Sequence, residues 1–390
     1  MPELSPAPAP SRVLLNPLAG GAIPGPTPDR APLAFHRQLP GYAPTPLVAA
    51  PDLARALGVG QVWVKDEASR LGLPAFKILG ASWAACRALA ARLGAALPPD
   101  ADLATLRDRL QPHLPLTLVA ATDGNHGRAV ARVAHWLGLD ARIYVPADMV
   151  PARRDAIRDE GAAISVVTGT YDDAVALAAG QANGRNLVIA DTAMRDDEAV
   201  PRWVIDGYST ILWEIDDELA RRGESGPDLV AVQIGVGALA AAVTRHYRRS
   251  GVTPRPRLVG VEPSDAACVL ASVAAGAPVA VPGPHRSIMA GLNCGQPSPV
   301  AWPTISRGFD LFLAIDDDAA RAAMRALAGV GIVAGETGAA GLGGILALQH
   351  AATPDESTAF GLTPQARVLF FNTEGATDPD AYASVIEQGT

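Results

Sequence analysis

The sequence predicts an α/β protein of two lobes, each built on an open, mainly parallel sheet that is flanked by helices. Short apolar runs alternate with amphipathic stretches along most of the chain, which is typical of parallel sheets covered on both faces. The chain has 390 residues, 49% of them hydrophobic, so it can bury one large core or two moderate ones. We therefore expect two lobes.

The expected elements follow the order of the chain. Prolines recur through residues 1–34, which predicts an extended arm that could lie along a partner subunit. Short apolar runs predict strands at 61–65, 116–121, 141–145, 163–168, 186–190, 229–234, 257–261, 311–314 and 367–371. Amphipathic stretches predict helices at 81–89, 127–137, 151–161, 171–182, 200–219 and 238–249, with two more between the last two strands. The Gly- and Pro-rich stretch 276–307 is long enough to suggest a functional loop.

Charge and composition exclude several classes of partner. The net charge is −8 and the basic residues are scattered, which argues against nucleic acid and against an anionic membrane surface. No apolar run approaches the roughly 18 residues of a membrane span. Three cysteines do not make a disulfide framework and fit a reducing compartment. We expect a cytoplasmic protein without a metal site.

Lys77 is the first residue that indicates a chemistry. The chain has 32 basic residues, but only Lys65 and Lys77 are lysines. An ammonium, unlike a guanidinium, can lose its proton and attack a carbonyl carbon. Apolar neighbours and the following helix would both lower the pKa of Lys77. The alternative for either lysine is an ordinary surface side chain.

Three expected strand ends carry polar or glycine-rich loops, and ligands of parallel sheets bind at such ends. These loops are Thr122–Gly127, Gly235–Leu239 and Asn372–Gly375. The glycines of Gly235-Val236-Gly237 would let the backbone approach a phosphate, although a plain turn is an alternative. The third glycine of a dinucleotide fingerprint is missing, but Glu262 ends the next strand and leaves that interpretation open. A nucleophilic lysine with a phosphate loop is best explained by pyridoxal 5′-phosphate.

Several motifs carry a resemblance to a known family. They are Lys65-Asp66-Glu67, Leu73-Pro74-Ala75-Phe76-Lys77-Ile78-Leu79-Gly80, Asp123-Gly124-Asn125-His126-Gly127, Asp191-Thr192, Met289-Ala290-Gly291-Leu292 and Thr373-Glu374-Gly375. From about residue 33 to 380 the chain resembles the β-family, or fold type II, of pyridoxal-phosphate enzymes, whose fold is like that of tryptophan synthase β. Within it, the chain is most similar to the diaminopropionate ammonia-lyases.

The resemblance implies roles for the cofactor site. Lys77 would carry the cofactor covalently and later carry protons, and Asn125 would donate to the phenolic oxygen. Thr373 would face the pyridine nitrogen, where a hydroxyl leaves the ring unprotonated and favours prompt loss of a β leaving group. The backbone amides of the phosphate loop would bind the phosphate, and this loop comprises Gly235, Val236, Gly237, Ala238 and Leu239. The family's loop has more glycines than Gly235-Val236-Gly237-Ala238, so this loop departs from the family's pattern.

Asp123 is the departure that indicates the substrate. Similar hydroxy-amino-acid dehydratases carry serine there, whereas a carboxylate can hold a β-ammonium or take a proton from Cα. Asp191 offers a second carboxylate, so with Lys77 there are bases for both faces of the substrate, and both enantiomers of 2,3-diaminopropionate are expected to react. The alternatives are a helix N-cap for Asp123 and a turn residue for Asp191.

The remaining site predictions concern substrate contacts and cysteines. Besides the two aspartates, Gly124, His126 and Met289 are expected to contact the substrate, with His126 packed in its loop and without an acid–base role. Cys268 and Cys294 are expected to be buried thiols, although the resemblance hints at a labile disulfide that orders the loop.

The expected domains are the arm 1–34, a large cofactor-anchoring domain of 35–112 and 199–390, and a small mobile domain of 113–198. The expected reaction is α,β-elimination of 2,3-diaminopropionate to pyruvate and ammonia by a homodimer, a common symmetric state. A serine or threonine dehydratase is the alternative within the fold. A nucleotide-binding oxidoreductase is the alternative outside it. A catalytically inactive scaffold is disfavoured because Lys77 and Asn125 are both present.

Overall fold

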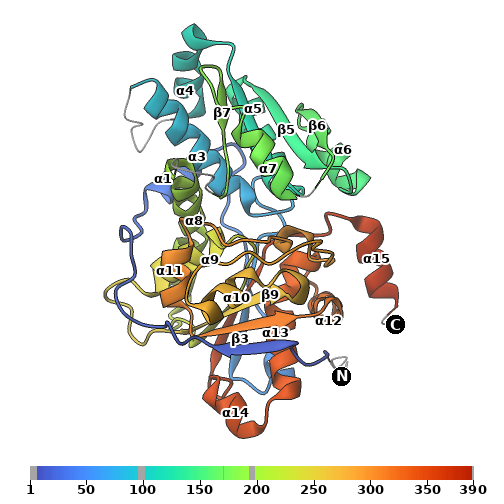
Figure 1. Ribbon diagram of the computed structural model, residues 1–390. Coiled ribbons are helices and arrows are strands. Elements are labelled where there is room, and N and C mark those ends of the chain that lie inside the picture. The colour runs from blue at the N-terminus through green and yellow to red at the C-terminus, as the bar shows by residue number, and fades with distance from the viewer. Residues whose placement is uncertain (1–6, 95–101, 170, 193–197, 389–390) are drawn as a thin grey trace. The chain divides into compact units, whose positions relative to one another are not determined.

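A computed structural model describes residues 7–94, 102–169, 171–192 and 198–388. The chain divides into two compact units: unit 1 is Met1–Thr27, Thr45–Ser69 and Ile211–Thr390, and unit 2 is Pro28–Pro44 and Arg70–Thr210. Each unit contains one open sheet with helices packed on it (Figure 1). The predicted fold class is therefore confirmed. Within the described ranges, no helix has both the length and the apolar composition needed to cross a bilayer.

Unit 1 is built on a seven-stranded sheet in the order β1-β10-β9-β8-β11-β3-β2. The five inner strands are parallel, and the two edge strands run antiparallel to their neighbours. Every residue of β8 and β10 is buried, as expected for strands covered on both faces. The strands are β1 Arg12–Leu15, β2 Leu47–Ala49, β3 Gln61–Asp66, β8 Leu229–Gln233, β9 Arg257–Pro263, β10 Leu311–Ile315 and β11 Arg367–Asn372.

The helices of unit 1 include the glycine- and alanine-rich α13, which is almost entirely buried and contacts β8, β9, β10 and β11. Its glycines allow close approach, since a Cβ at Gly344 would lie 2.5 Å from Val261 Cγ2. The helices are α2 Pro51–Ala56, α9 Ala238–Tyr247, α10 Cys268–Ala275, α11 Trp302–Gly308, α12 Asp317–Gly329, α13 Glu336–Ala351, α14 Pro354–Ala359 and α15 Pro379–Glu387.

Unit 2 contains a four-stranded, wholly parallel sheet in the order β6-β5-β4-β7. Its strands are β4 Thr117–Ala121, β5 Asp140–Pro146, β6 Ala163–Val167 and β7 Asn186–Val188. Its helices are α1 Ala31–His36, α3 Lys77–Arg92, α4 Leu103–Leu110, α5 Asn125–Leu137, α6 Pro151–Asp159 and α7 Tyr171–Ala179. The long helix α8, Ala199–Arg222, contains the sequence position at which the contact-based division falls.

Some boundaries differ from those expected. Part of the predicted arm is a strand, because residues 12–15 pair with β10, while residues 1–6 lie outside the described ranges. The end of the predicted loop 276–307 is helical, because α11 begins at Trp302 with Pro303 in its first turn. The units also place 70–112 with residues of the predicted small domain, because α3 packs on α5. The division into an anchoring and a mobile domain stays a prediction.

Candidate active site

Lys77 opens helix α3 in unit 2, directly after the N-cap residue Phe76. Its Nζ donates to Asp191 Oδ2 at 2.9 Å, and the lysine side chain is 22% exposed. The positive end of a helix disfavours a cation, whereas a carboxylate at this distance favours one. The sequence indicated the helix next to Lys77 but not the carboxylate that pairs with it. The structure therefore brings together two of the predicted catalytic residues.

Asp191 follows strand β7 by three residues and is buried. Burial alone would raise its pKa, but the charges of Lys77 and His126 and the hydrogen bond from Lys77 lower the pKa to about 2. Asp191 is consequently ionised at any ordinary working pH. Its contact with the lysine favours a role in the chemistry over that of a plain turn residue.

Asp123 follows strand β4 and precedes helix α5. Burial raises the pKa of Asp123 to about 8, Arg153 opposes the rise, and Asp148 and Asp191 add to it. At neutral pH the group is therefore largely protonated. The alternative of a helix cap is wrong, because Gly124 holds the N-cap position without a side-chain cap.

Asn125 and His126 occupy the first two positions of α5, so this helix begins two residues earlier than predicted. The His126 ring is buried and its Nε2 lies 2.7 Å from the carbonyl oxygen of Ile189, so this nitrogen is the protonated one and donates. Burial lowers the pKa of His126. The geometry agrees with a packing role. Gly127 is required here, because a Cβ would lie 2.3 Å from Thr122 Cγ2.

Tyr208 is a neighbour of Lys77 that the sequence did not indicate. It lies on α8 within unit 2, fully buried, with its ring centroid 4.6 Å from that of Phe76. Gly80 admits the ring, since a Cβ there would lie 2.5 Å from Tyr208 Cε1. Burial raises the pKa of Tyr208, while the charge of Lys77 lowers it. The one sequence feature that could have indicated a bulky neighbour here is Gly80, which lies about one helical turn after Lys77.

The phosphate loop Gly235–Leu239 lies in unit 1, where it connects β8 to α9. Gly237 is the N-cap of α9 and has φ +102°, and no side chain caps this helix end. A Cβ at Gly235 would lie 3.0 Å from the carbonyl oxygen of Gly291 and 3.2 Å from Cys294 Sγ. Uncapped amides at the start of a ten-residue helix, with close glycine backbone before them, fit a phosphate group.

Thr373 follows β11 in unit 1 and is nearly fully buried. Gln233 Nε2 donates to the carbonyl oxygen of Phe371 at 2.9 Å and to Thr373 Oγ1 at 2.8 Å. The carbonyl contact fixes the amide nitrogen as the donor, so the Thr373 hydroxyl accepts and keeps its own proton to donate. That geometry suits an unprotonated ring nitrogen. Gln233 was missed, although it is the one polar residue of a wholly buried strand.

Met289 and the two cysteines lie in unit 1. Met289 is completely buried in the hydrophobic core, so contact with a substrate would require this loop to rearrange. Cys268 and Cys294 are both buried thiols, the state favoured from the sequence. Burial raises the pKa of Cys268 and makes it unreactive as a thiol. The disulfide between them is not formed in the structure and stays a prediction.

Two other residues have structural partners. Glu262 accepts the amide hydrogens of Val269 and Leu270 at 2.8 Å each, so it caps α10 and does not support a ribose-binding role. Lys65 is buried in unit 1 and donates to Glu214 Oε2 at 2.6 Å and to the carbonyl oxygen of Thr45 at 2.8 Å. Among the described residues, no group of His, Cys, Asp and Glu side chains could hold a metal ion.

Comparisons with known proteins identify the family of this chain. A family model described as pyridoxal-phosphate dependent enzyme matches residues 38–363. The diaminopropionate ammonia-lyase of Salmonella typhimurium is 36% identical over 368 residues, which cover 92% of this chain and 91% of that protein. The crystal structure of the holo diaminopropionate ammonia lyase from Escherichia coli has a TM-score of 0.91 at 32% identity and covers 98% of both chains. Another crystal structure of that lyase, in complex with an aminoacrylate-PLP azomethine reaction intermediate, has a TM-score of 0.87 at 32% identity and covers 99% of both chains.

Proposed function

Because this chain belongs to the family of pyridoxal-phosphate dependent enzymes, we propose that it is an ammonia-lyase acting on 2,3-diaminopropionate. The reaction is an α,β-elimination that consumes one water and yields pyruvate and two molecules of ammonia. The similarity to diaminopropionate ammonia-lyases extends over nearly the whole chain and supports this substrate.

Pyridoxal 5′-phosphate is the cofactor of the family, and the residues present fit it. Lys77 would hold it covalently, Asn125 would bind its phenolic oxygen, and the amides of the phosphate loop would bind its phosphate. Thr373 would donate to the ring nitrogen, since its oxygen already accepts from Gln233. When bound, the cofactor withdraws electrons from the substrate Cα and so acidifies the proton there.

The proposal rests on two carboxyl groups whose charges interact, Asp123 and Asp191, of which Asp191 is paired with Lys77, and whose pKa values lie on opposite sides of neutrality. Such a division separates the acid and base roles in a site. Asp191, ionised while it pairs with the Lys77 ammonium, would hold Lys77 in place, and it would become a stronger base when that ammonium charge is lost. Asp123, protonated when no substrate is bound, would ionise as it pairs with the β-ammonium of the substrate. That pairing selects a β-amine over a β-hydroxyl.

Two bases also allow two stereochemistries. Lys77 Nζ would remove the Cα proton from one face of the substrate, and a carboxylate would remove it from the other. We therefore propose that both enantiomers of 2,3-diaminopropionate react. The chain is further proposed to act in the cytoplasm as a homodimer. Its three cysteines, too few for a disulfide framework, support the compartment, and the frequency of symmetric dimers among enzymes supports the oligomer.

An assay of 2-oxo acid formation over a panel of β-substituted amino acids tests the proposal, with pyruvate as the product of diaminopropionate and serine and 2-oxobutyrate as the product of threonine. Both enantiomers of 2,3-diaminopropionate should turn over with the highest kcat/KM, above serine and threonine. Lys77→Ala should lower kcat by about 10⁴-fold or more, because covalent and proton-transfer roles are lost together. Faster turnover of serine or threonine would assign the chain to the dehydratases, and no 2-oxo acid from any member of the panel would refute the elimination.

A further inference from the structure

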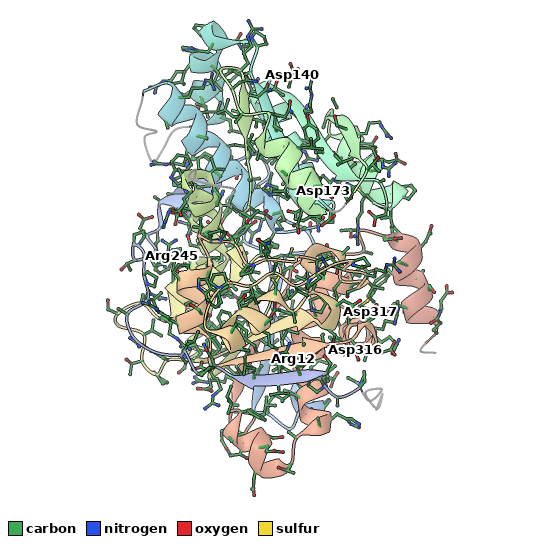
Figure 2. The ribbon with its side chains drawn as sticks, viewed as in Figure 1. Arg12, Asp140, Asp173, Arg245, Asp316 and Asp317 are labelled. Carbon is green, nitrogen blue, oxygen red and sulfur yellow. The ribbon has the colours of Figure 1, made fainter. Side chains whose placement is uncertain are left out.

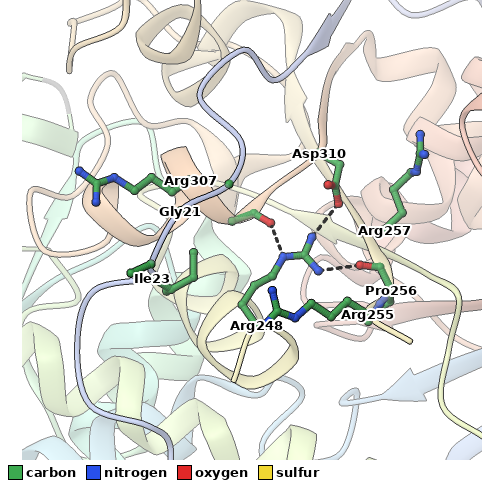
Figure 3. Close-up of a pocket in the computed structure, with 11 residues that line it drawn as sticks. Gly21, Ile23, Arg248, Arg255, Pro256, Arg257, Arg307 and Asp310 are labelled. Carbon is green, nitrogen blue, oxygen red and sulfur yellow. Dashed lines mark hydrogen bonds and ion pairs between the residues drawn. The ribbon is translucent and has the colours of Figure 1, made fainter. Parts of the chain in front are cut away.

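A cavity of about 460 Å³ in unit 1 is lined by four arginines and one aspartate (Figure 3). The arginines are Arg248, Arg255, Arg257 and Arg307, and the aspartate is Asp310. Its volume lies in the range of small-molecule sites. The chain as a whole carries a net charge of −8, so a cavity rich in positive charge differs from the rest of the protein. Arginine clusters in cavities attract anions.

The Arg248 side chain has structural partners and forms part of the cavity wall, so we do not count it among the ligand-binding groups. Its Nε donates to the carbonyl oxygen of Gly308 at 2.9 Å, its Nη1 to that of Pro256 at 2.7 Å and its Nη2 to Asp310 Oδ2 at 2.7 Å. Figure 3 shows these three contacts around one guanidinium. Arg248 and Asp310 therefore neutralise each other and fix the shape of the cavity.

No acidic side chain among the described residues pairs with the other three arginines. Within the part of the chain that the structure describes, Arg255 and Arg307 make no side-chain hydrogen bond or ion pair, and Arg257 donates only to a backbone carbonyl. The cavity also lies at the C-terminal end of α9, which carries about half a negative charge. Three uncompensated guanidiniums exceed that effect, so the field in the cavity favours an anion.

The N-terminal segment forms the opposite wall and is held in place. Asn16 Nδ2 donates to the carbonyl oxygens of Ser306 and Phe309, at 2.9 and 2.6 Å. Arg245, labelled on α9 in Figure 2, donates from two nitrogens to the carbonyl oxygen of Pro26. Between these attachments, residues 20–23 line the cavity. The amides of residues 21–23 donate no hydrogen bond within the described chain, so they are available to a ligand.

We propose that this cavity binds a small, multiply charged anion that carries phosphate groups. Guanidinium forks match phosphate oxygens in pairs, and backbone amides add donors. The cavity is separate from the phosphate loop, because the two lie at opposite ends of α9, a ten-residue helix of about 15 Å. Helix α9 thus runs from the phosphate loop to the cavity. Helix α11 packs closely on α9, since a Cβ at Gly308 would lie 2.0 Å from Thr244 Cγ2.

Calorimetric titration of the cofactor-loaded enzyme with inorganic pyrophosphate, at about 0.15 M salt, tests the proposal. The bound cofactor occupies the phosphate loop, so binding there does not compete. One saturable site per chain is expected. The double substitution Arg255→Gln/Arg307→Gln should weaken it by about tenfold or more, since two charge-assisted contacts are lost. Binding is measured without turnover, so the result is independent of the proposed reaction.

A matched control is a pair of arginines changed elsewhere. Arg109→Gln removes an exposed guanidinium of unit 2 that makes no hydrogen bond or ion pair with a described residue, and Arg92→Gln removes a second exposed guanidinium of the same unit. This control variant should bind pyrophosphate like the wild type. Amide exchange should also slow in residues 16–27 when the ligand is added. Absence of saturable binding to the wild type, or equal weakening in both variants, would overturn the proposal.

Discussion

Asp123 and Asp191 are the same residue type in one unit, yet they differ in charge at neutral pH. Burial dominates at Asp123, whereas the ion pair with Lys77 outweighs burial at Asp191. A sequence shows both carboxylates but not their surroundings. The sequence indicated Asp123 and Asp191 after strands and Lys77 before a helix, but it did not indicate their protonation.

The pKa of Asp123 makes a pH dependence testable. Below pH 8 the group is protonated, so kcat/KM for diaminopropionate should rise as the pH passes through about 8 from below. Asp123→Asn should lose this rise and lower kcat/KM by about 100-fold at pH 9, because the pairing charge is absent. The measurement is a pH profile from 6 to 10.

The control is Asp140→Asn, which removes an exposed carboxylate at the start of β5 in the same unit (Figure 2). Its profile should match the wild type. The amines of the substrate titrate identically in every variant, so the difference between profiles isolates Asp123. An ionisation near pH 8 that persists in Asp123→Asn would contradict the assigned role.

Residues that act through a partner were harder to predict than residues that carry chemistry themselves. Tyr208 and Gln233 lie far along the chain from the groups that they contact, Lys77 and Thr373. Only the fold brings them together. The sequence features that indicate them are Gly80, which leaves room for the Tyr208 ring, and the position of Gln233 as the only polar residue of a buried strand.

Among the elements, the phosphate loop shows most directly how backbone conformation determines binding. Gly237 has φ +102°, which an L side chain rarely adopts, and a Cβ there would lie 3.0 Å from Ile305 Cδ1. The loop must hold this conformation for its amides to face one point. Any distortion should therefore lower affinity for the cofactor before it lowers the stability of the fold.

Gly237→Ala should accordingly raise the dissociation constant of pyridoxal 5′-phosphate by about tenfold or more, since the donors at the helix start are displaced. The measurement is a spectrophotometric titration of cofactor-free protein. Gly331→Ala is the control: Gly331 also has a positive φ, +78°, but a Cβ there meets nothing within 4 Å. It should cost about 1 kcal/mol of stability and leave cofactor affinity unchanged. Equal affinity in both variants would refute the assignment of the loop.

The elements that the sequence predicted well are long or strongly apolar. All nine predicted strands correspond to strands β3 to β11, because each is a compact apolar run between loops. The edge strands β1 and β2 were missed. They have four and three residues, and no local sequence pattern indicates that they pair with β10 and β3.

At the scale of the whole molecule, chain length and the alternation of strands with helices predicted two lobes but not the boundaries between them. The α3 helix precedes the four-stranded sheet in the sequence, and only its packing on α5 places it with that sheet. Contacts between distant segments determine a unit, and a sequence read in order gives little information on them.

Sedimentation equilibrium tests the proposed oligomer. A closed pair with two-fold symmetry should give twice the mass of the chain at micromolar concentration, because symmetric enzymes commonly associate in this way. The cofactor-loaded protein should be used. A single species of monomer mass across the concentration range would contradict the homodimer.

The strand order of unit 1 has a consequence for how the protein is made. The β11 strand lies between β8 and β3, so the seven-stranded sheet lacks a central member until residues 367–372 have been synthesised. The four strands of unit 2 lie within residues 117–188, so they can pair while the ribosome is still translating. A growing chain would thus expose the unfinished larger sheet to chaperones until residue 372 has left the ribosome.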